Sequence, residues 1–520
     1  MVADGPFRKI QGASGVWLLL ILLGFTCAAT DWPQFRGLNH DGVSPDRIIT
    51  NWTGSVTNPV WRVPASNALC SLVVSGGRVY TQAIRNVGGE AREVCVALSA
   101  TNGVELWATP LDEASYPHGG VGYDDGPRST PAVAEGGVFI ITSYLKVYRL
   151  DPATGAVVWE KDLVSLYGSV VIAWQNAASP LVANGLLYLN ASTSSQSLMA
   201  LRTSDGSLAW RSQNEGLSHA TPVLATIHGV PQVIFATQQG VVSLHPTNGN
   251  LLWRIGYPFQ YSTSLAASPV VWEDVVFVVG GRAYGMASVA YQAHFSNNVW
   301  TASRLWSSNT LAAHWMTPIC HDGHLYGHFG IFSFDSANAE LTCLDIRTGI
   351  VKWKTAGFGR AGAVLVDNQL VSLTERGELV LARPDTNSYV EIGRFRAIPG
   401  YAPNDNKCWN GPAVSDGKVF VRSSALVAAF DLSTPALRLE PPQFAGPDRL
   451  SLTVADASGA SLASNRVASM EVLAGTNLAD SLSQWVRLTN GLTLTNGRVR
   501  IDNVDASGRP RRYFIVKEPD

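Results

Sequence analysis

The sequence predicts an all-β fold: an eight-bladed β-propeller with four-stranded blades, followed by a small β-sandwich. One observation behind this prediction is a recurring turn phrase, in which a glycine is followed four residues later by a tryptophan. The copies end at Trp107, Trp159, Trp210, Trp253 and Trp353. The second observation is a phrase that begins each unit: a small residue, often Ser or Thr before Pro, and then two apolar residues, with weaker copies at Ser71, Gly362 and Gly411. Repeats of about 40–50 residues with this pattern are typical of propeller blades.

Each unit reads as four antiparallel strands. The first strand begins at the Pro phrase, where the missing N–H of proline is not needed. The second follows a tight turn, the third runs into the Gly turn, and the fourth carries the tryptophan. Glycine suits that turn because it adopts a positive φ without strain. Eight Pro phrases predict eight blades, and they begin at Ser71, Ser129, Ser179, Thr221, Ser268, Thr317, Gly362 and Gly411.

The two ends of the repeat region are expected to share one blade. Trp61 lies before the first Pro phrase, whereas the last unit, from Pro412 to about Asp431, has three strands and no tryptophan. The strand of Trp61 therefore completes the last blade and removes an open edge. Phe395 takes the place of the tryptophan in the seventh unit. The fifth unit matches least well, because residues 290–295 replace the turn phrase before Trp306.

Composition and the chain ends narrow the class of protein. The 520 residues carry a formal net charge of −2 and 15% charged side chains, which gives no electrostatic case for nucleic-acid binding. Residues 1–29 read as a secretory signal peptide, with Arg8-Lys9 before a short apolar core and small residues at 27–29. Lipidation of Cys27 is the alternative. We expect the propeller at 30–434, a Pro-rich linker at 435–449 and the β-sandwich at 450–520, in a protein exported to the periplasm or beyond.

Five cysteines remain in the mature chain. Cys70 and Cys95, and Cys320 and Cys343, are spaced alike within two units, so they form either disulfides within a blade or buried free thiols; the state of Cys408 stays open. The chain has no CxxC or CxxCH motif, and therefore no c-type haem or zinc-ribbon signature. Three histidines, at 321, 324 and 328, straddle a turn and are not expected to form a metal site.

The repeats resemble the PQQ-like, or quinoprotein alcohol dehydrogenase-like, β-propeller repeat over about residues 31–432. The family phrase Ala-x-Asp-x-x-Thr-Gly-x-x-x-Trp is matched best by Asp345, Thr348, Gly349 and Trp353. The segment from Asp31 to Ser44 resembles the start of exported members, and the C-terminal module loosely resembles sandwich modules of secreted bacterial proteins. The resemblance implies that tryptophans dock between neighbouring blades: Trp61, Trp107, Trp159, Trp210, Trp253, Trp306 and Trp353.

A ligand site is expected where the loops before the innermost strands ring one mouth of the central channel. Its candidate residues are Asp124, Asp125, Arg128, Trp174, Asn176, His219, His314, Trp315, Arg360, Asn406 and Trp409. Arg128 could pair with a carboxylate of a quinone or substrate, an Asp could accept a proton from an alcohol, and Trp315 or Trp409 could stack on a flat ring. The alternative is that these groups satisfy turns between blades and line a wet channel.

Members of this family differ in function. Some are alcohol dehydrogenases that use PQQ and calcium, some are outer-membrane assembly factors of the BamB type, and many are uncharacterised. This chain departs from the dehydrogenase pattern in having no adjacent Cys-Cys pair, no clear Glu/Asn/Asp calcium set and no haem segment, although Asn176 could serve as one ligand. PQQ with calcium is therefore not favoured. We expect a monomeric binding or scaffold module for a protein, polysaccharide or small ligand, with the dehydrogenase and the assembly factor as alternatives.

Overall fold

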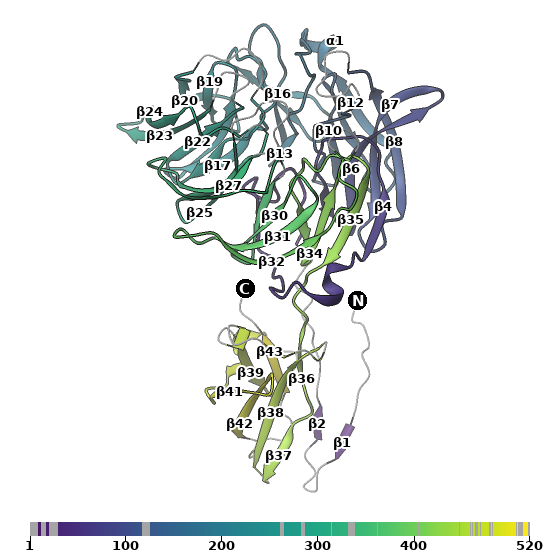
Figure 1. Ribbon diagram of the computed structural model, residues 1–520, viewed down its shortest axis with the longest axis vertical. Helices are drawn as coiled ribbons and strands as arrows, with labels where there is room; N and C mark the ends of the chain where they lie inside the picture. The colour runs from purple at the N-terminus through teal and green to yellow at the C-terminus, as the bar shows by residue number, and fades with distance from the viewer. Residues whose placement is uncertain are drawn as a thin grey trace. The chain divides into compact units, whose positions relative to one another are not determined.

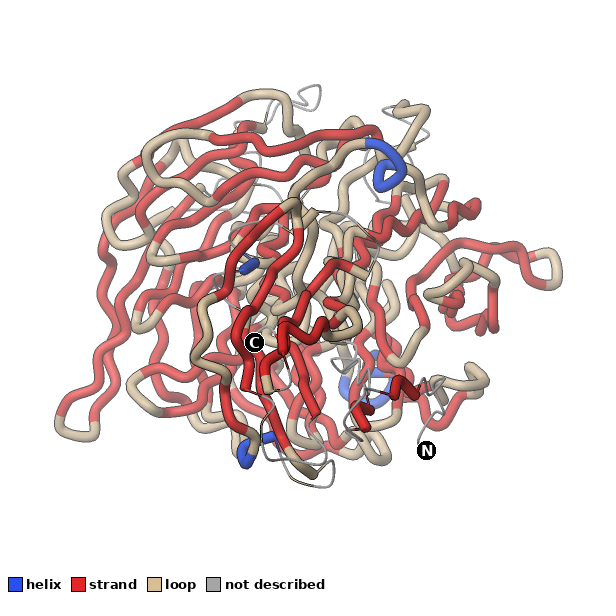
Figure 2. Tube along the Cα trace, turned by 90° about the horizontal axis from the view of Figure 1, so that it is seen from below, coloured by secondary structure: helices blue, strands red, loops and turns tan. Residues whose placement is uncertain are grey.

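The computed structural model describes residues 9–11, 17–19, 30–116, 125–259, 265–281, 287–313, 315–330, 339–360, 362–402, 406–446, 448–457, 459, 461–462, 466–467, 470–477, 480, 482–505, 507 and 513–517. The chain divides into two compact units, one of residues 29–433 and one that combines residues 1–28 with 434–520. Strands dominate both units, and helices are few and short (Figure 2). None of the helices in the described ranges is long and apolar enough to span a membrane.

The first four sheets of the larger unit each contain four strands that follow one another in the chain and pair antiparallel (Figure 1). Sheet 1 holds β5 (Val73–Ser75), β6 (Arg78–Val87), β7 (Glu90–Ser99) and β8 (Glu105–Glu113). Sheet 2 holds β9 (Ala132–Ala134), β10 (Gly137–Ile141), β11 (Lys146–Leu150) and β12 (Val157–Asp162), and the short helix α1 (Leu163–Tyr167) follows it. Sheet 3 holds β13 (Leu181–Ala183), β14 (Leu186–Asn190), β15 (Leu198–Arg202) and β16 (Leu208–Ser212). Sheet 4 holds β17 (Val223–Ile227), β18 (Val230–Ala236), β19 (Gly240–Leu244) and β20 (Leu251–Gly256).

The next four sheets repeat this order. Sheet 5 holds β21 (Val270–Trp272), β22 (Val275–Val279), β23 (Ser288–Ser296) and β24 (Val299–Ser308). Sheet 6 holds β25 (Ile319–His321), β26 (His324–Phe329), β27 (Glu340–Asp345) and β28 (Val351–Thr355). Sheet 7 holds β29 (Ala363–Val366), β30 (Gln369–Leu373), β31 (Glu378–Arg383) and β32 (Val390–Arg396), and β3 (Val43–Ser44) joins β29 in parallel. Sheet 8 holds β33 (Ala413–Ser415), β34 (Lys418–Arg422) and β35 (Leu426–Asp431).

The N-terminal part of the chain supplies the fourth strand of sheet 8. Strand β4 (Trp61–Pro64), which follows the 3-10 turn η1 (Gly54–Thr57), pairs antiparallel with β35, so that Trp61 faces Ala429 (Figure 1). Apolar packing is also cyclic, because each sheet shares a buried cluster with the next one, and sheet 8 shares one with sheet 1. An all-β chain with sheets packed in this order is consistent with a β-propeller.

Tryptophans on the fourth strands join one sheet to the next. In six cases the indole N–H donates to a backbone carbonyl in the turn between the third and fourth strands of the following sheet, at 2.7 to 3.1 Å. The pairs are Trp61 with Ala100, Trp107 with Pro152, Trp159 with Thr203, Trp210 with Pro246, Trp306 with Ile346, and Trp353 with Asp385. Phe395 of sheet 7 packs instead on Phe430 of sheet 8, with ring centroids 5.0 Å apart.

Trp253 is the exception to this docking pattern. Its indole N–H donates to the side chain of Gln232 within its own sheet, at 2.8 Å. The next sheet has no Gly turn to receive it, because β23 and β24 form a long hairpin whose turn residues Asn297 and Asn298 both have positive φ. Two positive φ values are those of the tight hairpin turn that matches strand twist. Sheet 5 contacts sheet 4 through Tyr291, whose hydroxyl donates to Gly256 O at 3.0 Å.

The smaller unit contains three sheets in its described residues. One pairs β1 (Lys9–Gln11) with β2 (Trp17–Leu19). The second holds β36 (Leu437–Leu439), β37 (Gln443–Gly446), β38 (Arg449–Asp456), β41 (Leu492–Thr495) and β42 (Arg498–Asp505). The third holds β39 (Glu471–Gly475), β40 (Val486–Arg487) and β43 (Tyr513–Lys517), with the 3-10 turn η3 (Leu482–Gln484) before β40. One apolar cluster draws side chains from both C-terminal sheets.

The structure differs from the expected linker at 435–449. Strands β36 and β37 lie within that range, and both pair with β38. Prolines are frequent in linkers, but they also fit between short edge strands. Pro441 and Pro442 lie between these two short strands, where the sheet needs no N–H from them.

Candidate functional site

Loops from four sheets converge beside the first strands of the larger unit. Three of the loops come directly before β9, β25 and β33, a fourth comes before β29, and the turn between β30 and β31 adds one carboxylate. We call the polar and aromatic side chains that meet there the mouth cluster, which consists of Asp125, Arg128, Trp315, Arg360, Glu375, Lys407 and Trp409.

Asp125 is held by two cations. Its carboxylate pairs with the Lys407 ammonium, and the Arg128 guanidinium lies 3.5 Å from its second oxygen. Asp125 and Lys407 are 5% and 3% exposed, so this is a buried ion pair. Gly126 lets the loop take this path, because a Cβ there would lie 2.3 Å from Asn67 O. A buried pair of this kind is stable only when both charges are compensated.

The second carboxylate of the cluster, Glu375, accepts hydrogen bonds from three groups of the chain itself. The donors are the Trp409 indole N–H at 3.1 Å, the Arg360 backbone N–H at 2.9 Å and the Tyr401 hydroxyl at 3.4 Å. Glu375 is buried. The Glu375 carboxylate thus connects the loop before β33, through Trp409, with the loop before β29, through Arg360.

The aromatic part of the cluster is a pair of indoles. The rings of Trp315 and Trp409 are 4.9 Å apart at an angle of 40°, and the Trp315 N–H donates to Trp409 O at 3.2 Å. Two cations lie near the Trp409 ring, with Arg360 at 5.4 Å and Lys407 at 5.2 Å from its centroid. Cations near an indole face gain from the ring quadrupole. The cluster therefore offers flat, half-buried aromatic surface next to positive charge.

Arg128 links the cluster to a third buried carboxylate, that of Glu93. Its guanidinium donates to Trp174 O at 3.0 Å and lies 6.0 Å from the centre of the Tyr116 ring. The Tyr116 hydroxyl donates to Glu93 at 2.7 Å, and Ser143 N donates to the other oxygen of Glu93 at 3.2 Å. Burial raises the pKa of the Glu93 carboxyl above its usual range.

Other residues predicted for the site lie in loops and serve the backbone there. The Asn176 amide donates to Ala178 O at 3.0 Å and accepts from Ala178 N at 3.1 Å, which closes its own turn. His219 is buried, and its Nε2 lies 2.6 Å from Gln175 O. Asn406 donates to the carbonyls of Pro399 and Gly400. The predicted candidates Asp124 and His314 lie outside the described residues.

Sequence reasoning missed Lys407 and Glu375. Lys407 stands one residue from the candidate Asn406 and two from Trp409, so its place in the loop could have drawn notice. Glu375 gave no such signal, because it lies between a second and a third strand rather than in a loop before a first strand. Only the packed loops bring it to Trp409.

The described residues do not fit a centre of PQQ with calcium. Calcium takes six to eight oxygen ligands, usually with several carboxylates. Here both carboxylates of the mouth cluster are engaged by the chain's own cations and N–H groups, and the Asn176 side-chain amide is hydrogen-bonded to backbone groups of Ala178 and Thr142. Among the described residues, no group of three or more His, Cys, Asp and Glu side chains is placed to hold a metal ion.

The cysteines add no redox pair to the site. All five of the propeller region, Cys70, Cys95, Cys320, Cys343 and Cys408, are free thiols, so the free-thiol alternative holds rather than disulfides within a blade. Burial raises the pKa of the Cys408 thiol to about 12, which keeps it protonated and unreactive at neutral pH.

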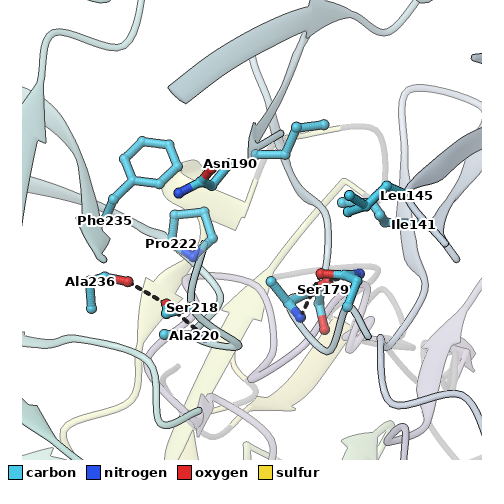
Figure 3. Close-up of a pocket in the computed structure, with 12 residues that line it drawn as sticks. Ile141, Leu145, Ser179, Asn190, Ser218, Ala220, Pro222, Phe235 and Ala236 are labelled. Carbon is cyan, nitrogen blue, oxygen red and sulfur yellow. Dashed lines mark hydrogen bonds between the residues drawn. The ribbon is translucent and has the colours of Figure 1, made fainter. Parts of the chain in front are cut away.

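The larger unit has two hollows beside its loops. A cavity of about 10 Å³ between sheets 2, 3 and 4 is lined by Ile141, Asn190 and Phe235 among others, and Ser218 donates to Ala236 O at its edge (Figure 3). That volume holds at most one water molecule. A groove of about 500 Å³ runs from Phe358 past Glu375 to Arg394, and it has room for a small ligand beside the mouth cluster.

Comparison with known proteins agrees with the fold. A family model described as outer membrane protein assembly factor BamB matches residues 90–355. Two proteins of that name, from Moranella endobia (strain PCIT) and Yersinia pestis, are each 23% identical to this chain over 298 and 292 residues. The alignments cover 55% of this chain and 58% of each relative, so the chain spans less than two thirds of the length of the curated relatives it matches.

Solved structures with this fold include an enzyme. The quinohemoprotein alcohol dehydrogenase from Comamonas testosteroni superposes with a TM-score of 0.54 at 13% identity, over 80% of this chain and 82% of that chain. At that identity the likeness shows the fold alone, because one fold hosts unrelated functions.

Proposed function

We propose that this chain is an exported binding scaffold. The premise is that it belongs to the PQQ-like family described as outer membrane protein assembly factor BamB. In this proposal sheets 1 to 8 are the eight blades of one propeller, closed by β4, and the two C-terminal sheets form a small β-sandwich. Residues 1–29 are the signal peptide, and the mature protein works in the periplasm or outside the cell as a monomer.

The observation that carries this proposal is the state of the two mouth carboxylates. A catalytic base needs a carboxylate directed at the substrate, and a cofactor metal needs carboxylate oxygens directed at the ion. Asp125 is engaged by Lys407 and Arg128, and Glu375 by Trp409, Arg360 and Tyr401. These contacts hold the loops together, and the half-buried indoles of Trp315 and Trp409 are the surface that remains for a ligand.

Family membership favours a protein partner as the bound molecule. The curated relatives are named for assembly of outer membrane proteins, and this chain shares the repeats through which the family model matches. An assembly role in the cell envelope is therefore the first specific form of the scaffold proposal. Polysaccharides and small molecules are the other ligand classes that the mouth cluster could accept.

The first experiment is thermal unfolding of the mature protein with and without PQQ plus calcium. A ligand at ~100 times its dissociation constant adds about 2.7 kcal/mol to the free energy of unfolding. We expect no shift in the unfolding midpoint. A rise of several degrees that is lost in Arg360→Gln would overturn the scaffold proposal in favour of a dehydrogenase.

The second experiment tests the assembly role. We expect the tagged protein, expressed in its own host envelope, to purify together with components of the β-barrel assembly machinery. Recovery without such partners, in the absence of a PQQ shift, would remove the assembly role and leave the polysaccharide and small-molecule classes to be screened.

A further inference from the structure

The opening segment of the mature chain, residues 31–46, runs along the first strands of the propeller. We call this segment the strap. It belongs to the same compact unit as sheets 1 to 8. The segment from Asp31 to Ser44 is the one that resembles the start of exported family members, but none of its residues belongs to the mouth cluster.

The strap contacts six of the eight sheets in turn. Trp32 exchanges two backbone hydrogen bonds with Val74 of β5, at 2.8 and 2.9 Å. Pro33 O then accepts from Val133 N of β9 at 2.6 Å. The remaining contacts are Gln34 with Val182 of sheet 3, Arg36 with Thr317 and Pro318 before β25 of sheet 6, Gly42 with Leu365 of sheet 7, and Asp46 with Gly417 of sheet 8.

Both ends of the strap lie at the turns that follow first strands. Asp31 accepts from Ser75 Oγ at 2.7 Å and Gly76 N at 3.2 Å, and Asp46 accepts from Gly417 N at 3.0 Å. The mouth cluster lies mainly in loops that precede first strands. The strap therefore enters from the end of the channel opposite the mouth.

Within the channel the strap folds on itself. Gly37 N donates to Gln34 O and Gly42 N to Arg36 O, both at 2.9 Å. Gly37 has a φ of +79°, and a Cβ there would lie 2.8 Å from the Trp32 ring. Only glycine fits this turn, because the left-handed conformation and the indole both disfavour a side chain. The motif is thus explained by the shape of the strap.

Arg36 is the innermost anchor of the strap. Its buried guanidinium donates to four carbonyls, two within the strap and two on the loop before β25. They are His40 O at 3.1 Å, Asp41 O at 2.8 Å, Thr317 O at 2.9 Å and Pro318 O at 3.0 Å. Burial lowers the pKa of Arg36 to about 10, so it stays charged at neutral pH. Lysine could not replace it, since one ammonium lacks the planar fork that reaches four acceptors.

We propose that the strap plugs the central channel, so that the propeller is a cup open only at the mouth cluster and not a pore. This inference rests on the proposed propeller. A groove of about 770 Å³ remains beside the strap, lined by Leu38 of the strap and by residues of sheets 1 to 4. Because Gln34 contacts sheet 3 and Arg36 contacts the loop before β25 of sheet 6, the plug spans the axis between these two sheets. Ligands then reach the indoles of the mouth cluster from one side only.

Hydrogen–deuterium exchange of the full mature chain tests the plug. The amides of Val133 and Leu365 donate to strap carbonyls, whereas the amides inside β10 and β22 pair only within their sheets. We expect Val133 and Leu365 to exchange as slowly as those ladder amides. Fast exchange at Val133 and Leu365 with a protected ladder would overturn the proposal, because the strap would then be open in solution.

Two variants locate the anchor. In Arg36→Ala we expect faster exchange at Val133 and Leu365, with the exchange of the β10 ladder amides unchanged. If the alanine variant does not fold, the same measurement is made on Arg36→Lys. The matched control is Arg211→Ala, which also removes an arginine that donates to backbone carbonyls but lies on sheet 3, outside the strap. Unchanged exchange in both Arg36 variants would contradict the anchor role. Failure of the scaffold proposal would appear in the partner and PQQ experiments and not in these amides.

Discussion

At the scale of single residues, buried polar side chains join parts of the chain that are far apart in sequence. Arg422 is almost fully buried in β34, and its guanidinium donates to Ser66 O at 3.2 Å and to Gln82 O at 3.1 Å, both from the N-terminal side of the propeller. Arg36 does the same between the strap and sheet 6. Such groups stabilise only if every donor finds an acceptor, because an unpaired buried charge is costly.

His40 predicts how acid affects the protein. Burial and the neighbouring Arg36 charge lower the pKa of His40 from its ordinary 6.5 to about 3. Between these two pH values the unfolded chain binds a proton at His40 that the folded chain does not, so the free energy of unfolding falls as the pH falls, by roughly 1.4 kcal/mol per pH unit. We expect His40→Asn to flatten this dependence between pH 6 and pH 4, measured as denaturant midpoints.

Asparagine is the suitable replacement there, since position 40 has a φ of +61° and asparagine tolerates the left-handed region. The control is Gln213→Asn, at another left-handed position (φ +45°) whose side chain does not ionise, which should leave the acid dependence as in the wild type. Parallel curves for wild type and His40→Asn would show that the titration lies elsewhere.

At the scale of elements, the third-to-fourth-strand turn is the joint between neighbouring sheets. The turn glycine lies directly on the indole of the preceding sheet, so glycine and tryptophan form one unit of packing. At Gly155, which has a φ of +74°, a Cβ would lie 2.6 Å from both Thr109 Oγ1 and the Trp107 ring. Trp107 also donates to Pro152 O in the same turn.

A pair of glycine variants separates packing from backbone strain. Gly155 and Gly136 both have positive φ, but a Cβ at Gly136 meets nothing within 4 Å. Alanine at either position costs about 1–2 kcal/mol for the left-handed conformation. Only Gly155→Ala adds overpacking, typically a further ~1–3 kcal/mol. We expect the lower unfolding midpoint for Gly155→Ala, and equal midpoints for the two variants would contradict docking at this turn.

At the scale of the whole molecule, the two compact units have separate interiors. The apolar clusters of the C-terminal sheets contain only residues from Leu437 onward, whereas the clusters of sheets 1 to 8 end at Leu432. Since burial of apolar surface is the main stabilising term, neither unit needs the other's core.

A shortened chain tests this independence. We expect a chain of residues 30–433 to unfold in calorimetry at the same midpoint as the main transition of a chain of residues 30–520. The cyclic packing of sheet 8 on sheet 1 is complete without the C-terminal sheets. A midpoint lower by more than a few degrees would mean that the smaller unit stabilises the larger one.

Much of the strand order was predictable from local patterns. The Pro phrases, tight turns and Gly–Trp spacing specify where each strand begins and which side chain docks, because these choices depend on φ and on alternation within a few residues. Trp253 shows the limit of that reasoning, since its partner is Gln232 and not a turn of the next sheet. The expected linker, which holds β36 and β37, shows it again.

The sequence by itself therefore determined the repeating unit of this protein, an all-β chain of four-stranded sheets joined by tryptophan and glycine. Only the tertiary structure decided which polar groups meet. Asp125 pairs with Lys407 across 282 positions of sequence, and Arg36 reaches Pro318 across a similar span. Strand patterns are encoded locally, whereas these contacts depend on how the sheets are set around one another and on the paths of the loops and the strap between them.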